Sequence, residues 1–237
     1  MGPKEIDQII VPEKLVPGYS SEELNFGPLD PEALDPRCVE VRFGDPMVDA
    51  PRLLQLFTHP ETIEHIAGIT PNTTEKEIRD IYRSSDLVLL TAESPSGLIV
   101  GTITVQKPAF GARAGGVLRL AVDPEYRNKG IGKKLVKAAN AFVFRDAKDE
   151  ANKGLNCSQA RASVIVGVSR YEIPQNLFRG EGYLGQTELV GTTRGWNNRL
   201  KRLSNRNSQP MLLDRDRYKQ SHRGEHVTHF PKQRPTN

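Results

Sequence analysis

The sequence predicts an α/β domain in which strand-like and helix-like segments alternate around one central unit, residues 117–136. An apolar run from Val117 to Val122 indicates a buried strand. Asp123-Pro124 ends it, because proline cannot donate to a strand ladder and restricts the residue before it. Beyond a basic, glycine-bearing turn, apolar residues recur with the period of a helix at Ile131, Leu135, Ala138 and Phe142. A strand, a tight turn and a helix are therefore the predicted local plan.

Length and composition favour one domain with tails. The chain has 237 residues and is 37% hydrophobic, enough for one substantial core. No apolar run approaches the about 20 residues that span a bilayer, and the first residues lack the pattern of a signal peptide. Cys38 and Cys157 are far apart, which favours a reducing compartment over a disulfide framework. We expect a cytoplasmic protein without a membrane segment.

Positive charge is concentrated at the C-terminal end. Residues 194–237 hold eleven Lys and Arg against three Asp and Glu, a net +8, which leaves −4 for residues 1–193 of the total +4. Such a basic end could meet nucleic acid. Solvated surface is the simpler interpretation, so nucleic acid is an alternative that we do not favour.

The N-terminal third predicts a lead-in followed by a strand and three helical segments. Residues 1–36 hold six prolines and little periodicity, as in an extended segment. Alternation over 39–43 predicts the first strand. Asp49 is the predicted cap of a helix bearing Leu53, Leu54 and Phe57, and Ile63 and Ile66 mark a second helical piece. Thr74 and Glu77 have the spacing of a capping box, ahead of an apolar face formed by Ile78, Ile81 and Tyr82.

The remaining elements follow from β-branched runs and turn residues. Strands are predicted over 87–92 and 98–105, joined by a hairpin turn at 93–97, with a glycine-bearing loop over 110–116. After the long helix we predict a strand over 163–168 with Gly167 as a possible bulge, a short helix over 174–179, a turn over 180–183, and a last antiparallel pair, 186–190 with 211–214.

The turn between the central strand and helix has the chemistry of an anion site. Gly130 and Gly132 allow close backbone approach, and the first turn of a helix offers unpaired N–H groups and a positive dipole end. Lys129, Lys133 and Lys134 add positive charge. Without further context, the glycines could equally just close a tight connection.

The wider motif resembles a known family. Arg127-x-x-Gly130-x-Gly132, preceded by Leu-Ala-Val-Asp-Pro-Glu-Tyr at 120–126, resembles the acyl-CoA-binding signature of the GCN5-related N-acetyltransferases (GNAT). The element order of residues 39–218 is also similar to that family. The resemblance implies a mixed, largely antiparallel sheet flanked by helices, with splayed central parallel strands that bind acyl-CoA. The acyltransferase domain would span 39–218, after the lead-in of 1–36 and before a basic, disordered tail of 219–237.

The resemblance also implies acetyl-CoA as acyl donor and direct attack by a primary amine of a small molecule or protein. In that reading the central strand pairs with the pantetheine arm, and amides of the turn hold the pyrophosphate. The implied cofactor-binding residues are Leu120, Ala121, Val122, Arg127, Asn128, Lys129, Gly130, Ile131, Gly132 and Lys133.

The implied catalytic side chains are where this sequence departs from the family. Phe178 stands where many members have a tyrosine that protonates the leaving thiolate, and Leu118 and Arg119 stand where some have a carboxylate base. The substitutes that we consider are Tyr171 and Ser169 as proton donors and Glu64 and His65 as a relay for the amine proton, with Glu172 as a further candidate. Each has an alternative as an ordinary capping or surface residue.

Residues 191–209 are interpreted as a long basic loop between the last two strands. Arg194 and Trp196 could select an acceptor that carries phosphate or carboxylate, and the alternative is an exposed loop. We expect no metal site, because His222, His226 and His229 lack accompanying Cys or acidic ligands. The rival function is a GNAT-fold module that binds acyl-CoA or nucleic acid without transfer. Either a monomer or a homodimer is compatible with the sequence.

Overall fold

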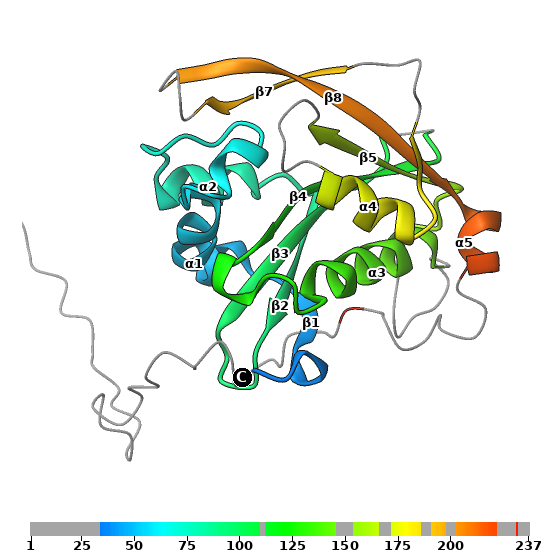
Figure 1. The fold of residues 1–237 in the computed structure, drawn as a ribbon, viewed down its shortest axis with the longest axis horizontal. Helices are drawn as coiled ribbons and strands as arrows, with labels where there is room; N and C mark the ends of the chain where they lie inside the picture. Colours follow the sequence, from blue (N-terminus) through cyan, green and yellow to red (C-terminus); the bar gives the residue numbers. More distant parts are fainter. Residues whose placement is uncertain are drawn as a thin grey trace, which may run out of the picture.

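One mixed sheet organises the chain (Figure 1). The computed structural model describes residues 34–109, 112–145, 154–165, 172–185, 191–197, 202–221 and 231. In this part of the chain the strand order is β1-β2-β3-β4-β5-β8-β6, and β7 pairs with β8. Every described pair is antiparallel except β4 with β5, as the predicted mixed sheet requires.

The first elements are β1 (Glu40–Phe43), α1 (Pro46–Thr58), the short 3-10 helix η3 (Ile63–His65) and α2 (Glu75–Ile81). Asp45, and not the predicted Asp49, caps α1, because the helix begins at Pro46 and the Asp45 carboxylate accepts from the Met47 amide at 2.9 Å. Asp49 is buried instead and accepts from the Arg42 guanidinium at 3.1 Å. Both hydrogen bonds of the predicted capping box, between Thr74 and Glu77, are present at the start of α2.

The central elements lie close to their predicted places. They are β2 (Leu87–Glu93), β3 (Ile99–Gln106), β4 (Ala114–Val122), a 3-10 helix, η4 (Pro124–Tyr126), and α3 (Ile131–Phe144). β4 begins earlier than the predicted Val117, because Gly116 and Val117 pair with the end of β3 and Ala114 to Val117 pair with β5.

The next strand, β5 (Gln159–Ile165), begins four residues before the predicted strand of 163–168. Ala160 and Ala162 are buried while Arg161 is exposed, so the segment alternates with the period of a strand. The first half of the strand has no β-branched residues, and the strand predicted from the sequence therefore begins too late, at Ser163. Gly167 and the rest of 166–171 lie outside the described residues.

The C-terminal elements are α4 (Glu172–Gly180), β6 (Leu184–Gly185), β7 (Gly191–Asn197), β8 (Arg202–Asp214) and α5 (Arg215–Ser221). The predicted loop over 191–209 is wrong: Gly191 to Asn197 pair with Arg202 to Ser208 as a β-hairpin. The segment is polar, so it lacks the apolar alternation from which strands are predicted. The predicted partner segment 186–190 lies outside the described residues, and 211–214 belong to β8, which pairs with β5 and β6.

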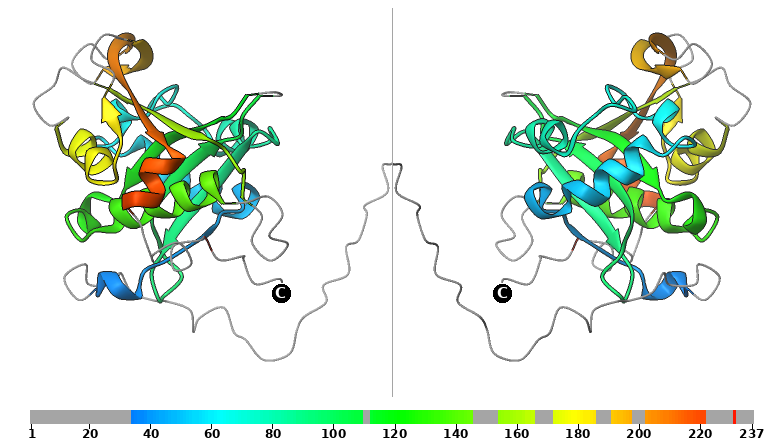
Figure 2. Two further views of the ribbon diagram at one scale, coloured as in Figure 1. Left: turned by 90° about the vertical axis from the view of Figure 1, so that its right-hand side faces the viewer. Right: turned by 90° about the vertical axis from the view of Figure 1, so that its left-hand side faces the viewer.

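Two apolar clusters cover opposite faces of the sheet. On β2, Leu89 belongs to the cluster with α1 and α2, whereas Leu90 belongs to the cluster with α3 and α4, as expected from alternating side chains. Figure 2 shows α1 and α2 toward the viewer in its right view and α3, α4 and α5 in its left view. Among the described helices, none combines the length and apolar character needed to cross a membrane.

Candidate functional site

The two central strands separate along their length. β4 pairs with β5 only over Ala114–Val117, opposite Gln159–Ala162. Beyond Val117, β4 continues to Val122, while β5 continues to Ile165 in register with β8. Over 118–122, β4 therefore has no strand partner on its β5 side among the described residues. We call this separation of β4 (118–122) from β5 the gap. An unpaired strand edge of this kind can bind an extended ligand through N–H and C=O groups.

A bulge in β4 coincides with this separation. Thr102 pairs with Ala121 and Thr104 with Leu118, so Arg119 and Leu120 together stand opposite the single residue Ile103. Arg119 has a φ of 45°, in the left-handed region. A side-chain-bearing residue there costs about 1–2 kcal/mol, and bulges bend and twist the strand that contains them. The bulge thus turns the end of β4 away from β5.

The glycine turn lies at the far end of the same strand. Gly130 is the N-cap of α3 with a φ of 77°, and Asn128 also has a positive φ, 61°. No side chain caps the amides of this helix terminus within the described structure. A Cβ at Gly132 would lie 3.3 Å from Leu177 Cδ2 of α4, so that glycine permits close packing of the two helices. The arrangement suits a phosphate group, which helix N-termini with free amides bind readily.

Arg127 fastens the turn to the segment that precedes η3. Its Nη1 lies 2.8 Å from Glu61 Oε2, its Nη2 donates to Thr62 Oγ1 at 3.0 Å, and its Nε donates to the Val122 carbonyl at 3.2 Å. The side chain thus joins the end of β4, the turn and the segment that leads into η3. We infer a positioning role for this side chain.

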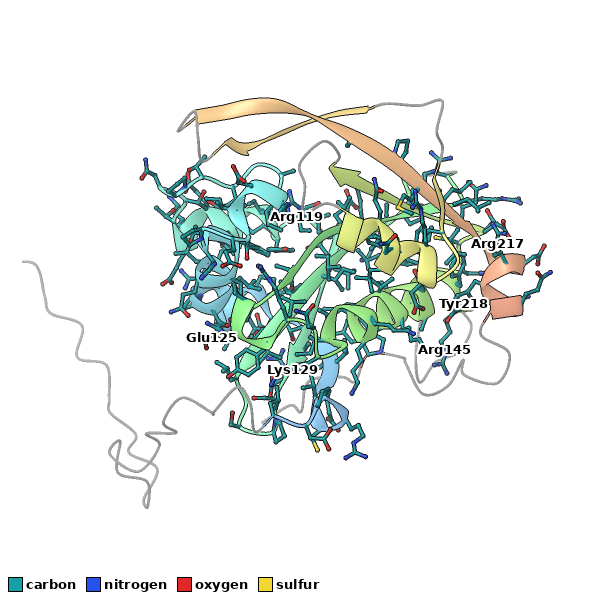
Figure 3. All side chains as sticks on the ribbon, viewed as in Figure 1. Arg119, Glu125, Lys129, Arg145, Arg217 and Tyr218 are labelled. Carbon is teal, nitrogen blue, oxygen red and sulfur yellow. The ribbon has the colours of Figure 1, made fainter. Side chains whose placement is uncertain are left out.

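The lysines of the turn are directed to different partners. Lys134 Nζ donates to the carbonyl of Val39 at 2.9 Å, so it holds the segment before β1 and does not belong to the predicted anion site. Lys133 Nζ lies 3.9 Å from Glu181 and is 58% exposed, which leaves its charge near the turn. Figure 3 shows Lys129 near the end of β4 that leads into the turn and Arg119 further up, within the strand.

The proposed proton-relay residues lie on η3. Glu64 and His65 are half-buried, and β7 packs beside η3, so this helix lies next to the β7–β8 hairpin. Arg194 and Trp196 belong to β7, whose side chains lie outside the described part of the structure. Ser169 and Tyr171 also lie outside it, and so does the side chain of Glu172.

Phe178 occupies the core and not the gap. It is 5% exposed and its ring packs edge-on against Tyr183, with centroids 5.1 Å apart. The Tyr183 hydroxyl donates to Asn140 Oδ1 at 2.7 Å, and burial raises the pKa of Tyr183, with further contributions from Glu181 and Tyr218. Neither ring is placed to protonate a leaving thiolate.

Sequence reasoning names Arg119 and Arg127 but does not predict how they shape the gap. It considered Arg119 only as the replacement of a carboxylate, and its bulged conformation has no sequence signal of the kind that a glycine gives. It placed the Arg127 motif at the turn without its side-chain contacts, because Glu61 and Thr62 are more than sixty positions away. Long-range partners of this kind are not readable from spacing.

Comparison with known proteins gives a matching domain model and solved structures with a similar fold. Residues 85–172 match the family model of the acetyltransferase (GNAT) domain. No curated protein matches the sequence. The solved structures that resemble the chain include the spermidine N-acetyltransferase of Vibrio cholerae in complex with CoA and spermine, with a TM-score of 0.59 and 15% identity over 77% of this chain and 98% of that one.

The same bacterial enzyme recurs in other forms. A chimera of it matches with a TM-score of 0.59 and 14% identity, over 76% of this chain and 98% of the chimera. Its structure with manganese ions matches with a TM-score of 0.56 and 13% identity, over 80% of this chain and 99% of that one. At such low identity these structures show the fold they share with this chain, and nothing about its substrate.

Proposed function

We propose that this chain, which has the fold of the GNAT acetyltransferases and matches their domain model over residues 85–172, is an acyl-CoA-dependent N-acyltransferase. The proposed reaction moves an acetyl group from acetyl-CoA to a primary amine in the cytoplasm. The observation that carries the proposal is the separation of β4 from β5 beyond Val117, next to a helix terminus with uncapped amides.

The chemistry needs few side chains. The amine nitrogen attacks the thioester carbonyl, a C–N bond forms, the C–S bond breaks, the ammonium proton is lost and CoA leaves as a thiolate. Holding both reactants in line and stabilising the developing oxyanion supplies most of the acceleration. Backbone groups of Leu120 to Val122 would hold the pantetheine arm, and amides of 127–132 with Lys129 and Lys133 would hold the phosphates.

Proton transfer is assigned to the half-buried pair on η3. An amine has a pKa of about 10.4 and a thiol of about 8.5, so removing the amine proton is the harder step at neutral pH. Glu64 or His65 would take that proton through water. Tyr171 or Ser169 would protonate the thiolate, or the thiolate would leave unaided.

A non-catalytic module is the second candidate, and one observation favours it. Phe178 stands where a tyrosine would serve as acid, and it is packed into the core. Such a module would bind acyl-CoA, or nucleic acid through its basic end, without transfer.

Isothermal titration with acetyl-CoA, CoA and 3′-dephospho-CoA tests the proposal. Binding of acetyl-CoA in the micromolar range, followed by thiol release in the presence of pooled primary amines, is the expected result. Binding without thiol release would favour the second candidate. The absence of binding would refute the acyl-CoA site itself.

A further inference from the structure

Arg119 differs from three other arginines that are partly or fully buried beside the sheet, each of which has a carboxylate partner. Arg42 is paired with Asp49 and Glu93, Arg52 with Asp123, and Arg127 with Glu61. Among the described residues, the Nε of Arg119 is buried without a hydrogen-bond partner and no carboxylate forms an ion pair with Arg119. The Nε of Arg215 is also buried without a partner, but the Nη2 of Arg215 donates to Phe144 and Asn156. A buried guanidinium N–H without an acceptor is unfavourable, so an absent acceptor is indicated.

The backbone at Arg119 points to the same conclusion. The residue sits at the β4 bulge with a φ of 45°, where glycine would be less strained. Backbone strain of this kind gathers at ligand-binding positions, where the surrounding structure fixes it. Here the strained residue carries a long cationic side chain at the point where the two central strands part.

The described surroundings of Arg119 are polar. The buried hydroxyl of Tyr82 lies 2.7 Å from Thr104 Oγ1, and burial raises the pKa of Tyr82 while the hydrogen bond to Thr104 and the charge of Arg119 oppose that rise. In Figure 3, Arg119 lies between α2 and α4, on the side of the sheet toward the β7–β8 hairpin. Residues 191–209 of that hairpin hold five Lys and Arg and no acidic residue.

The phosphates of CoA are expected elsewhere. The uncapped N-terminus of α3 comes after Val122, the last residue of β4. Arg119 comes before Val122 and lies near the other end of the unpaired stretch 118–122. A ligand anion at Arg119 therefore belongs to the acceptor. Its guanidinium fork suits a carboxylate or a phosphate, which it can bind through two N–H groups.

We propose that Arg119 is a specificity-determining residue that binds an anionic group of the acceptor, so that the acceptor class is a primary amine that also carries a carboxylate or phosphate. This inference rests on the proposed acyl transfer. It places the acceptor's anion at the bulge and its amine further along β4, toward the thioester.

Matched acceptor pairs test it by thiol release from acetyl-CoA. One pair is β-alanine and β-alaninamide, and the other is 2-aminoethyl phosphate and ethanolamine, so each pair differs in its anion and the two pairs separate carboxylate from phosphate. The wild type should prefer the anionic member of at least one pair. Arg119→Gln should lower kcat/KM for that member about 10- to 100-fold, because the variant loses a charge-assisted hydrogen bond whose free energy corresponds to such a factor. Arg119→Lys should restore part of it.

Arg113→Gln is the matched control, since Arg113 is exposed at the other end of β4 and its variant should behave as wild type. Acetyl-CoA affinity, measured by titration, should not change in Arg119→Gln. Weakened acetyl-CoA binding in that variant would assign Arg119 to the donor and overturn the proposal. A wild type that binds acetyl-CoA but acetylates neither anionic acceptor, or shows no preference for them, would also overturn it. Failure of the wild type to bind acetyl-CoA would instead refute the proposed function.

Discussion

Tyr183 and Phe178 decide what acid chemistry is available near the gap. Phe178 has no hydroxyl, and the hydroxyl of Tyr183 is buried and donates to Asn140 at 2.7 Å. Asn140 is itself fully buried on α3, and its Nδ2 has no partner among the described residues. The pair therefore fastens the turn after α4 to α3, and we predict that it takes no part in proton transfer.

Tyr183→Phe should lower the free energy of unfolding and leave turnover unchanged. The variant strands a buried amide oxygen, which costs about 1–3 kcal/mol. Replacing both partners, in Tyr183→Phe with Asn140→Leu, should recover much of the loss, because no orphaned acceptor remains. Denaturant unfolding and thiol release are the measurements. A fall in kcat for Tyr183→Phe with intact stability would mean that this hydroxyl does reach the reacting atoms.

The raised pKa of Tyr183 also predicts a pH dependence of stability. In the unfolded chain a tyrosine has a pKa of about 10, and burial raises the pKa in the fold. The stabilisation is therefore fully present below about pH 10 and is lost as the pH rises further, because only the unfolded state then releases the proton. Unfolding measured from pH 9 to 11 should show a steeper loss in the wild type than in Tyr183→Phe. Equal slopes would contradict the burial of this hydroxyl.

Among the elements, the turn into α3 depends on conformation more than on side chains. Gly130 has open space where a Cβ would stand, so no protein atom requires a glycine there. What requires it is the positive φ and, in the proposed function, the approach of a phosphate to the helix amides. Gly97, in the turn between β2 and β3, has a similar φ of 83° and similarly open surroundings.

Gly130→Ala and Gly97→Ala therefore form a matched pair. Each should cost about 1–2 kcal/mol of stability, since each forces a Cβ into the left-handed region. Only Gly130→Ala should weaken acetyl-CoA binding, because its methyl group would stand at the phosphate. Thermal unfolding and calorimetric titration of both variants give the comparison. Equal acetyl-CoA affinity in the two variants would mean that the turn is purely structural.

Local chemistry decided which elements could be predicted. The capping box of Thr74 and Glu77 and the glycine turn before α3 are complete within a few residues, and both are found as predicted. The hairpin of β7 with residues 202–208 of β8 was missed, because the sequence of 191–209 has no run of alternating apolar residues. The cap of α1 was misplaced because Asp45 and Asp49 both precede apolar residues. The start of the helix at Pro46 and the contact of Asp49 with Arg42 separate their roles.

At the scale of the molecule, the gap arises from three distant parts of the chain. The bulge of β4 turns its end away, β5 leaves it to follow β8, and Arg127 ties the turn to the segment before η3. The sequence predicted the participating strands and the turn through a family motif. It could not predict the anchoring contacts or Arg119, because these depend on register and on partners brought together only by folding.

The boundary of the domain at its C-terminal end follows from α5. Tyr218 is 4% exposed and its ring stacks on Phe144 of α3 at 4.7 Å, while Arg215 donates to the Phe144 carbonyl at 2.8 Å. A chain cut after Ser221 keeps these contacts. It loses Pro231, the one described residue beyond that point, which is buried.

Truncation after residue 221 should therefore leave acetyl-CoA affinity unchanged and lower the free energy of unfolding by about 1 kcal/mol, the value of one small buried apolar side chain. Truncation after Asp214 should cost at least about 3–5 kcal/mol, since it removes a buried aromatic side chain from the core. Thermal unfolding and titration of both truncated chains against the full chain measure the two effects. Loss of acetyl-CoA binding on the shorter cut at 221 would show that residues 222–237 are part of the cofactor-binding domain, and the predicted tail would then have to be assigned a structural role.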